Sequence, residues 1–165
     1  MIVMMLAPFR GQTDRSVGEQ EGADSVMDLV TALAYAATKK HGVLITLRAD
    51  GRPQSSDVAF LVRDATFVIS LTNTRAKTHN MRRDHRVVVH LTDPSTWTYA
   101  SFDGTVSLSP VTISSNDATN DALVDYYERV AGQAHPDWDE YRKAMVAEQR
   151  LLATVTPTSV VGQIH

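Results

Sequence analysis

The chain has 165 residues, of which 43% are apolar and 21% are charged, and it contains no cysteine. A chain of this size and composition is typical of a single globular domain that buries a core of its own. The absence of cysteine excludes disulfide frameworks, zinc ribbons, iron–sulfur clusters and thiol catalysis. The apolar runs are far shorter than the roughly 20 residues of a membrane-spanning helix, so we expect a cytoplasmic protein without membrane contact.

The net charge is only −3, but the positive charge is concentrated in one segment. Residues 75–86 contain a single acid, Asp84, among the bases Arg75, Lys77, Arg82, Arg83 and Arg86. Nucleic-acid binding generally needs a basic face across a whole domain. One basic segment in a weakly acidic chain instead favours binding of a small anion. We therefore expect a small-molecule substrate and no nucleic-acid partner.

The N-terminal residues 1–24 are predicted to form a disordered arm, because Gly11–Ser25 holds scarcely any large apolar residue. The ordered domain is expected to span residues 25–165. Asp24 and Ser25 are predicted to cap its first helix, which Gly42 ends. The apolar residues of this helix recur at helical spacing and are Met27, Leu29, Val30, Leu33 and Ala34.

Strand patterns follow, separated by turn residues and one short helix. A hairpin turn is predicted at Asp50-Gly51, and a bulge or sharp bend at Asp103-Gly104. Thr72-Asn73-Thr74 can cap a short polar helix over Arg75–Arg83. The predicted strands are Val43–Leu47, Gln54–Val62, Thr66–Leu71, Arg86–Leu91 and Trp97–Leu108.

Two longer helices and two closing strands complete the chain. The helices are predicted over Asp117–Val130 and Asp137–Arg150. The strands are predicted over Leu151–Thr156 and Ser159–Ile164, split by Pro157. Strands and helices do not alternate as they do in a doubly wound sheet. The elements therefore predict an α+β fold, an antiparallel β-barrel of six or seven strands with peripheral helices.

The histidines do not predict a metal site. His79, His85 and His90 form a cluster in the sequence, but His85 and His90 are an odd number of positions apart on one strand and so face opposite sides of a sheet. The serines do not lie in a nucleophile elbow. The scattered glycines form neither a GxGxxG motif nor a P-loop. We therefore expect no metal and no side-chain nucleophile.

The segment Ser70–Thr78 leaves a strand and opens the short polar helix with two cations, Arg75 and Lys77, in its first turn. Cations at this end oppose the helix dipole by about half a kcal/mol each. An anion bound to the free amide groups would make them favourable, with Arg75 as a bidentate partner and Lys77 as a point charge. The alternative is that both side chains point into solvent, and local physics leaves the two interpretations open.

The segment Arg52–Asp57 carries consecutive polar residues on a predicted strand. At least two of them face the concave side of a sheet, where polar groups need partners. A flat heteroaromatic ring with carbonyl and N–H edges would satisfy them. Alternatively, this is an edge strand whose polar residues face water.

Three segments resemble the pyridoxamine-5′-phosphate-oxidase-like superfamily of flavin and deazaflavin proteins, and more narrowly its actinobacterial branch that uses the deazaflavin coenzyme F-420. They are Gly42–Leu47, Asp50–Gln54 and Arg75–Asp84. The last, RAKTHNMRRD, is the most specific. The resemblance runs from about residue 26 to residue 164 and includes Trp97-Thr98-Tyr99, Asp137–Arg142 and Pro157–Gln163.

The resemblance implies a split β-barrel that forms a homodimer with two cofactor sites at the subunit interface. The residues that it assigns to the cofactor phosphate are Arg75 and Lys77, with the backbone of Ala76 and Thr78. The residues that it assigns to the ring are Gln54, Ser55, Ser56, Asp57, Ser70, Leu71 and Thr72. It further implies that Asn80 supports the phosphate loop and that Trp97 reaches the site from the partner subunit.

One departure from the family bears on the cofactor. Oxidases of pyridoxamine phosphate have a lysine against the flavin phosphate at the end of the strand that matches Arg52–Asp57, where this chain has hydroxyl and acidic side chains. The departure favours F-420 over FMN. The expected function is hydride transfer from reduced F-420 to a small conjugated or unsaturated acceptor. The alternatives are an FMN-dependent pyridoxamine or pyridoxine 5′-phosphate oxidase and a non-catalytic deazaflavin carrier.

Overall fold

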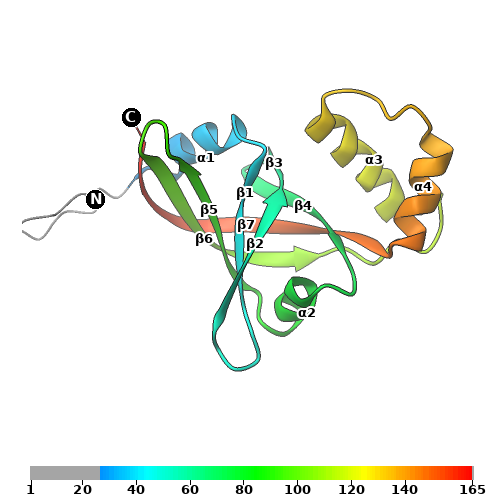
Figure 1. The fold of residues 1–165 in the computed structure, drawn as a ribbon, viewed down its shortest axis with the longest axis horizontal. Helices are drawn as coiled ribbons and strands as arrows, with labels where there is room; N and C mark the ends of the chain where they lie inside the picture. The colour runs from blue at the N-terminus through cyan, green and yellow to red at the C-terminus, as the bar shows by residue number, and fades with distance from the viewer. Residues whose placement is uncertain (1–26, 165) are drawn as a thin grey trace, which may run out of the picture.

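The computed structural model describes residues 27–164. These residues form a curled antiparallel sheet with helices around it (Figure 1). The helices are α1 Leu29–Ala37, α2 Ala76–Arg83, α3 Ala118–Ala131 and α4 Trp138–Ala147. The strands are β1 His41–Leu47, β2 Pro53–Ala59, β3 Leu61–Arg63, β4 Thr66–Thr72, β5 Arg86–Asp93, β6 Thr98–Leu108 and β7 Arg150–Gln163. None of these helices is long and apolar enough to span a membrane.

The strands pair in the order β2-β1-β5-β6-β7-β4-β3, and every pairing is antiparallel. The sheet curls on itself, so that β2 at one end of the order approaches β4 near the other end. This half-barrel confirms the predicted α+β barrel of antiparallel strands. Because β7 runs between β6 and β4, the last strand of the chain lies beside the residues that lead into α2.

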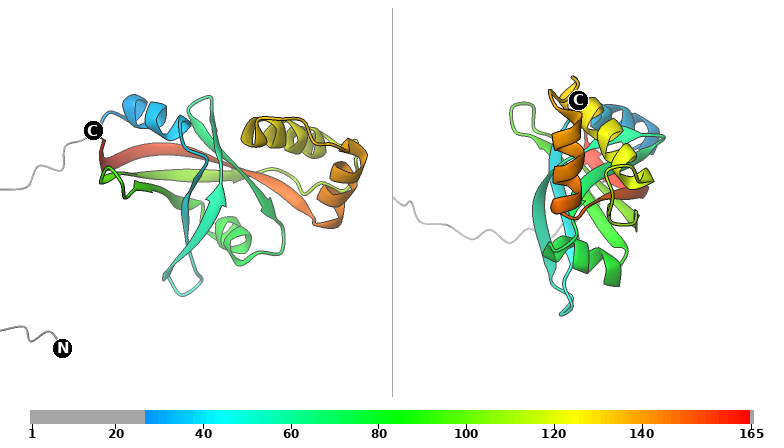
Figure 2. Two further views of the ribbon diagram at one scale, coloured as in Figure 1. Left: turned by 45° about the horizontal axis from the view of Figure 1, so that its top comes forward. Right: turned by 90° about the vertical axis from the view of Figure 1, so that its right-hand side faces the viewer.

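Two clusters of buried side chains stabilise the two faces of the sheet. Inside the curl, Phe67 packs edge-on against both Phe60 and Phe102, with ring centroids 5.2 and 4.9 Å apart. On the outer face, α3 and α4 bury Leu123 and Met145 against β4 and β7. Figure 2 shows these two helices as a separate layer beside the sheet. This layer forms one side of the pocket described below.

Strand β7 is continuous across Pro157, which corrects the predicted split at this residue. The register between β6 and β7 shifts between Asp103 and Gly104, as the Asp103-Gly104 pattern predicts. Gly104 is required at this position because a Cβ atom there would lie 2.6 Å from the carbonyl oxygen of Thr156. A bulge accommodates the proline, since it locally relieves the demand for ladder hydrogen bonds.

Other element ends also differ from the prediction. The cap of α1 is Asp28, whose carboxylate accepts from the amide of Thr31 at 2.9 Å, whereas Asp24 and Ser25 lie outside the described residues, as does the predicted arm over residues 1–24. Helix α1 ends at Ala37 rather than at Gly42. Val30 is 74% exposed, because the buried face of α1 is formed by Ala32, Leu33 and Ala36.

Two further boundaries were predicted too long. The segment Gln54–Val62 is two strands, interrupted at the buried Phe60, whose amide donates to the carbonyl oxygen of Lys40. Helix α4 ends at Ala147, and Gln149 has a left-handed backbone with φ of 52°. The turn at Gln149 sends Arg150 into β7 instead of the helix.

Candidate functional site

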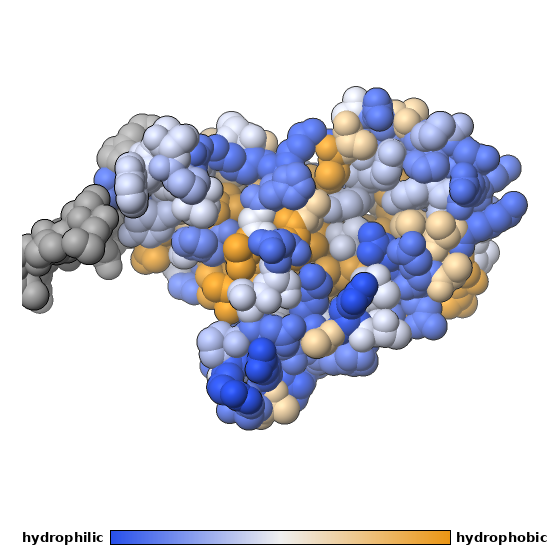
Figure 3. Space-filling view, viewed as in Figure 1, coloured by the Kyte–Doolittle hydropathy of each residue, from blue (hydrophilic) through white to orange (hydrophobic). Residues whose placement is uncertain are grey.

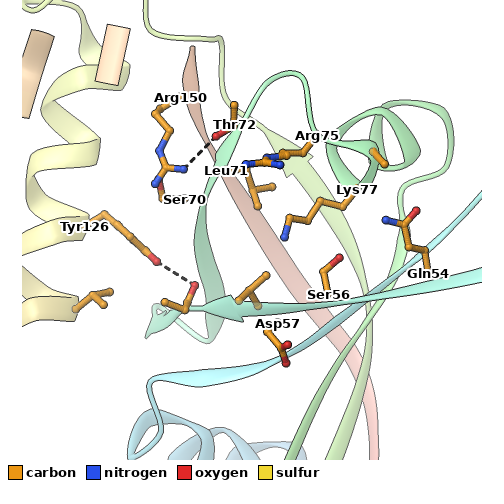
Figure 4. A pocket seen from close by; sticks show the side chains of 14 residues that line it. Gln54, Ser56, Asp57, Ser70, Leu71, Thr72, Arg75, Lys77, Tyr126 and Arg150 are labelled. Atoms are coloured by element: carbon orange, nitrogen blue, oxygen red, sulfur yellow. Dashed lines mark hydrogen bonds between the residues drawn. The ribbon is translucent and has the colours of Figure 1, made fainter. Parts of the chain in front are cut away.

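A pocket of about 680 Å³ lies between the start of α2, strands β2 and β4, helix α3 and the start of β7 (Figure 4). Its lining residues are Gln54, Ser56, Asp57, Val58, Ala59, Ser70, Leu71, Thr72, Arg75, Ala76, Lys77, Tyr126, Val130 and Arg150. Most of the residues that the resemblance assigned to a cofactor are therefore on one pocket. The two segments that local physics singled out, Arg52–Asp57 and Ser70–Thr78, meet there.

The start of α2 presents unpaired amide groups to this pocket. Arg75 is the N-cap, with an extended backbone and no side-chain cap, so Thr72-Asn73-Thr74 do not cap the helix as predicted. The amides of Thr78 and His79 donate to the Arg75 carbonyl oxygen. Within residues 27–164, the amides of Ala76 and Lys77 have no acceptor. Free amides and the helix dipole favour an anion at this point.

The cations at this helix start lack ion-pair partners. Arg75 and Lys77 have no carboxylate within 4.0 Å in the part of the chain that the structure describes. Burial, reinforced by the charges of Arg75 and Arg150 and opposed by that of Asp57, lowers the pKa of Lys77. The carboxylate of Asp57 points to the other side of β2 from Lys77 (Figure 4). The local field of the pocket is therefore positive.

Gln54 is oriented by a hydrogen-bond chain behind the pocket wall. Arg83 donates to Asn80 Oδ1 at 3.1 Å, which leaves the Asn80 amide nitrogen to donate to Gln54 Oε1 at 3.2 Å and to Thr46 Oγ1 at 3.0 Å. Because Arg83 can only donate, it sets the orientation of both amides. The free end of the Gln54 amide is then its NH₂ group, a further donor at the pocket.

Sequence reasoning missed the pocket residues contributed by α3 and β7. Tyr126 of α3 donates its hydroxyl to the carbonyl oxygen of Ala59 at 2.9 Å, and burial raises the pKa of this phenol. Arg150 donates through Nη1 to Thr72 Oγ1 at 3.2 Å. Both residues lie in segments that the sequence predicts to be amphipathic helices. No local signal distinguishes them from surface or core residues.

Other predicted site residues do not line the pocket. Ser55 alternates with Gln54 and Ser56 along β2 and is exposed on the opposite face. Thr78 is fully buried, and its hydroxyl ties the helix start to the Thr72 carbonyl oxygen at 2.9 Å. Asn80 lies behind Gln54, where it supports the pocket wall. The last predicted site residue, Trp97, is not near this pocket.

Trp97 is 84% exposed, in the turn between β5 and β6. Figure 1 shows this turn at the end of the sheet away from α3 and α4. Within one chain, Trp97 therefore does not reach the pocket, and its assignment to a partner's site stays a prediction.

Several known proteins are similar to this chain in sequence and architecture. A family model described as pyridoxamine 5′-phosphate oxidase matches residues 32–161. A conserved hypothetical protein from Mycobacterium tuberculosis is 22% identical, with a TM-score of 0.66, over 85% of this chain and 86% of that chain. An F-420 reductase is 23% identical, with a TM-score of 0.54, over 73% of this chain and 87% of that chain. A FAD-binding protein from Mesorhizobium loti is 15% identical, with a TM-score of 0.59, over 83% of this chain and 93% of that chain.

At these identities the solved structures show a shared fold, whereas the family model covers most of the described chain. The match includes β1 to β6, α2 and nearly all of β7, and so both walls of the pocket. It also confirms the resemblance to the pyridoxamine-5′-phosphate-oxidase-like superfamily. The chain belongs to the pyridoxamine 5′-phosphate oxidase family.

Proposed function

We propose that this pocket binds the deazaflavin coenzyme F-420 and that the protein is an F-420-dependent oxidoreductase, in which reduced cofactor transfers hydride to a small conjugated or unsaturated acceptor. The observation that carries the proposal is the start of α2. There, Arg75 and Lys77 have no carboxylate partner among the described residues and lie beside the amides of Ala76 and Lys77, which have no acceptor in that part of the chain. A phosphate ester supplies the acceptor oxygens and the negative charge that this arrangement lacks.

The remaining walls fit a ring system with a polar edge. Val58 and Val130 offer apolar surface, while Gln54 and Ser56 offer hydrogen-bonding groups from one face of β2. Gln54 faces the pocket with its NH₂ group, which suits a ring carbonyl. These residues would hold the ring, while Arg75 and Lys77 would hold the phosphate.

The chemistry requires little from the side chains. When bound, the reduced deazaflavin supplies the hydride, and water supplies the proton that completes reduction of the acceptor. The protein would bind and orient both molecules and shield them from solvent. This mechanism fits the pocket, whose lining includes hydrogen-bond donors and cations but no Ser-His-Asp triad.

FMN is the second candidate cofactor, because the family is described by an oxidase of pyridoxamine 5′-phosphate. Arg75 and Lys77 would also bind the phosphate of FMN. The matching part of β2, however, holds Ser55, Ser56 and Asp57, without the lysine that the oxidases place against the flavin phosphate. This departure favours F-420, and it ranks an FMN-dependent oxidase second.

A fluorescence titration of the purified protein with F-420 and with FMN tests the proposal. We expect micromolar or tighter binding of F-420 and weaker binding of FMN. Lys77→Ala should weaken F-420 binding by about 1–3 kcal/mol, roughly five- to 150-fold, because a charge-assisted phosphate contact is lost. Lys143→Ala, which removes an exposed lysine on α4, is the matched control and should bind as the wild type does.

Absence of F-420 binding would refute the proposal, and tighter binding of FMN would favour the oxidase. Turnover is measured separately, as loss of the reduced cofactor's absorbance when a panel of conjugated acceptors is added. Binding without turnover on any acceptor would identify a deazaflavin carrier instead of an enzyme.

A further inference from the structure

Arg150 brings a third cation to the pocket, and its Nε group has no hydrogen-bond acceptor within residues 27–164. Nη1 donates to Thr72 Oγ1 at 3.2 Å, whereas Nε is buried without a hydrogen bond. Nε forms only a long ion pair, 3.7 Å from Oε2 of Glu148, whose side chain is 56% exposed. A buried guanidinium N–H without an acceptor is costly, so this group is suited to a ligand.

Ser70 lies next to Arg150 on the same face of the sheet. In the β4–β7 ladder Thr72 pairs with Arg150 and Ser70 with Leu152, so Ser70 and Arg150 are diagonal neighbours. The hydroxyl of Ser70 is also buried without a hydrogen-bond partner among the described residues. Figure 4 shows the guanidinium directed toward Ser70 on the pocket wall. Two unsatisfied buried groups thus meet at one place in the pocket.

The charge of the pocket indicates how much negative charge its ligand carries. Arg75, Lys77 and Arg150 line it, against the single carboxylate of Asp57. Arg75 and Arg150 both lower the pKa of Lys77, after burial, so both arginines lie within electrostatic range of Lys77. One negative charge on a ligand would leave this cluster under-neutralised. Two or more negative charges would match it.

We propose that Arg150 and Ser70 form a second anion contact in the pocket, which binds a negatively charged group of the cofactor's tail in addition to the phosphate contact at α2. This inference rests on the proposed function and deepens it. The ligand class is a ring with a tail that carries at least two negative charges. A phosphate monoester provides both charges on one group, and a phosphodiester followed by a carboxylate provides them on two.

The test compares Arg150→Gln with wild type on two pairs of ligands. Each pair shares a ring and differs in its tail: FMN with riboflavin, and F-420 with its riboside that lacks the phosphate. We expect Arg150→Gln to weaken binding of a tailed ligand by about tenfold or more and to change binding of its tail-less partner by less than about twofold. The pair with the larger effect identifies which tail chemistry the contact serves.

Arg86→Gln is the matched control, because Arg86 is exposed and paired with Asp84 at 2.7 Å, away from the pocket. It should bind all four ligands as the wild type does. An Arg150→Gln variant that binds tailed ligands normally, or that loses tailed and tail-less ligands equally, would overturn the inference. Arg150→Lys, which keeps the charge, should recover part of the affinity and serves if the glutamine variant does not fold.

A probe without any ring separates this inference from the proposed function. Inorganic pyrophosphate should raise the Tm of the wild type, and raise that of Arg150→Gln by a smaller amount, whichever cofactor the protein uses. Equal shifts in the two proteins would overturn the second anion contact. Wild type that responds to pyrophosphate but binds neither F-420 nor FMN would sustain the contact and refute the proposed function.

Discussion

At the scale of single residues, the site depends on a lysine whose surroundings disfavour its charge. Lys77 lies in the first turn of α2, where the helix dipole opposes a cation. Its pKa is lowered by burial and by the charges of Arg75 and Arg150. An anion reverses this penalty, because it favours the protonated form of Lys77. Ligand binding and protonation are therefore coupled.

This coupling predicts a pH dependence. A bound anion raises the pKa of Lys77, so affinity is greatest where Lys77 is already protonated in the free protein. It falls as the pH rises from the lowered pKa of the free protein toward 10.5 and above. A titration of wild type between pH 7 and 10.5 should show this decline. Lys77→Arg should bind with much less decline, because arginine stays protonated.

Ionisation of the ligand affects wild type and Lys77→Arg equally, so its effect cancels in the ratio of their two affinities at each pH. A ratio that stays constant over the whole range would show that Lys77 does not contact the anion. The same titration with riboflavin, which has no phosphate, should give parallel profiles for the two proteins.

At the scale of elements, α3 depends on a single capping carboxylate. Asp117 accepts from the amides of Asn120, Ile113 and Ser114 at 2.8, 2.8 and 3.0 Å. Burial opposes its ionisation, but these hydrogen bonds prevail and lower the pKa of Asp117 to about 2. The cap orders the start of the helix that carries Tyr126 to the pocket.

Asp117→Ala should lower the free energy of unfolding by about 1–2 kcal/mol, because the helix loses its cap and several amides lose an acceptor. Because the folded pKa is depressed, this contribution is present above pH 3.8 and is lost as the pH falls toward 2. Urea unfolding at pH 7 and at pH 2.5 measures both values, and the difference between wild type and variant should shrink at the lower pH.

The matched control is Asp139→Ala, which removes an exposed carboxylate from the first turn of α4 that is not the cap. Its effect should be within about 0.5 kcal/mol at both pH values. An Asp117→Ala variant as stable as the control would show that the cap does not stabilise α3.

At the scale of the whole molecule, exposed apolar side chains mark a surface that residues 27–164 leave uncovered. Trp97, Tyr99 and Val161 are 84%, 37% and 46% exposed. Tyr99 and Val161 lie on paired strands, since Tyr99 is opposite Gln163 and Ser101 is opposite Val161. Trp97 is in the turn that leads into β6. Apolar groups that gather on a surface favour association with another protein surface.

We therefore predict that the protein is a homodimer. Sedimentation velocity should give a mass about twice the 18.2 kDa of the chain. Val161→Glu should shift the protein toward monomer, because it puts a charge on this surface. Ile113→Glu, at a residue that is 82% exposed near the start of α3, is the control and should leave the dimer intact. A wild-type protein that sediments as a monomer at micromolar concentration contradicts the prediction.

Much of this fold is readable in the sequence because strand and helix patterns are local. The strand Thr66–Leu71 is predicted within one residue of β4, and the bulge at Asp103-Gly104 lies where the sequence predicts it. The predicted split at Pro157 is wrong; it was predicted because a proline usually interrupts a strand. Here a bulge in the β6–β7 pairing, with Thr158 as the extra residue of β7, accommodates it, and that bulge depends on a pairing that local patterns do not specify.

The sequence by itself determined the half of the site that surrounds the start of α2. Arg75 and Lys77 follow from a strand, a turn and a helix that are contiguous in the chain, although only the structure shows that Thr72-Asn73-Thr74 do not cap this helix. Only the tertiary structure decided the other half, in which β7 returns beside β4 and brings Arg150 to Thr72 across 78 positions. Packing of the whole sheet and of the layer formed by α3 and α4 sets this pairing, so no spacing within the sequence encodes it.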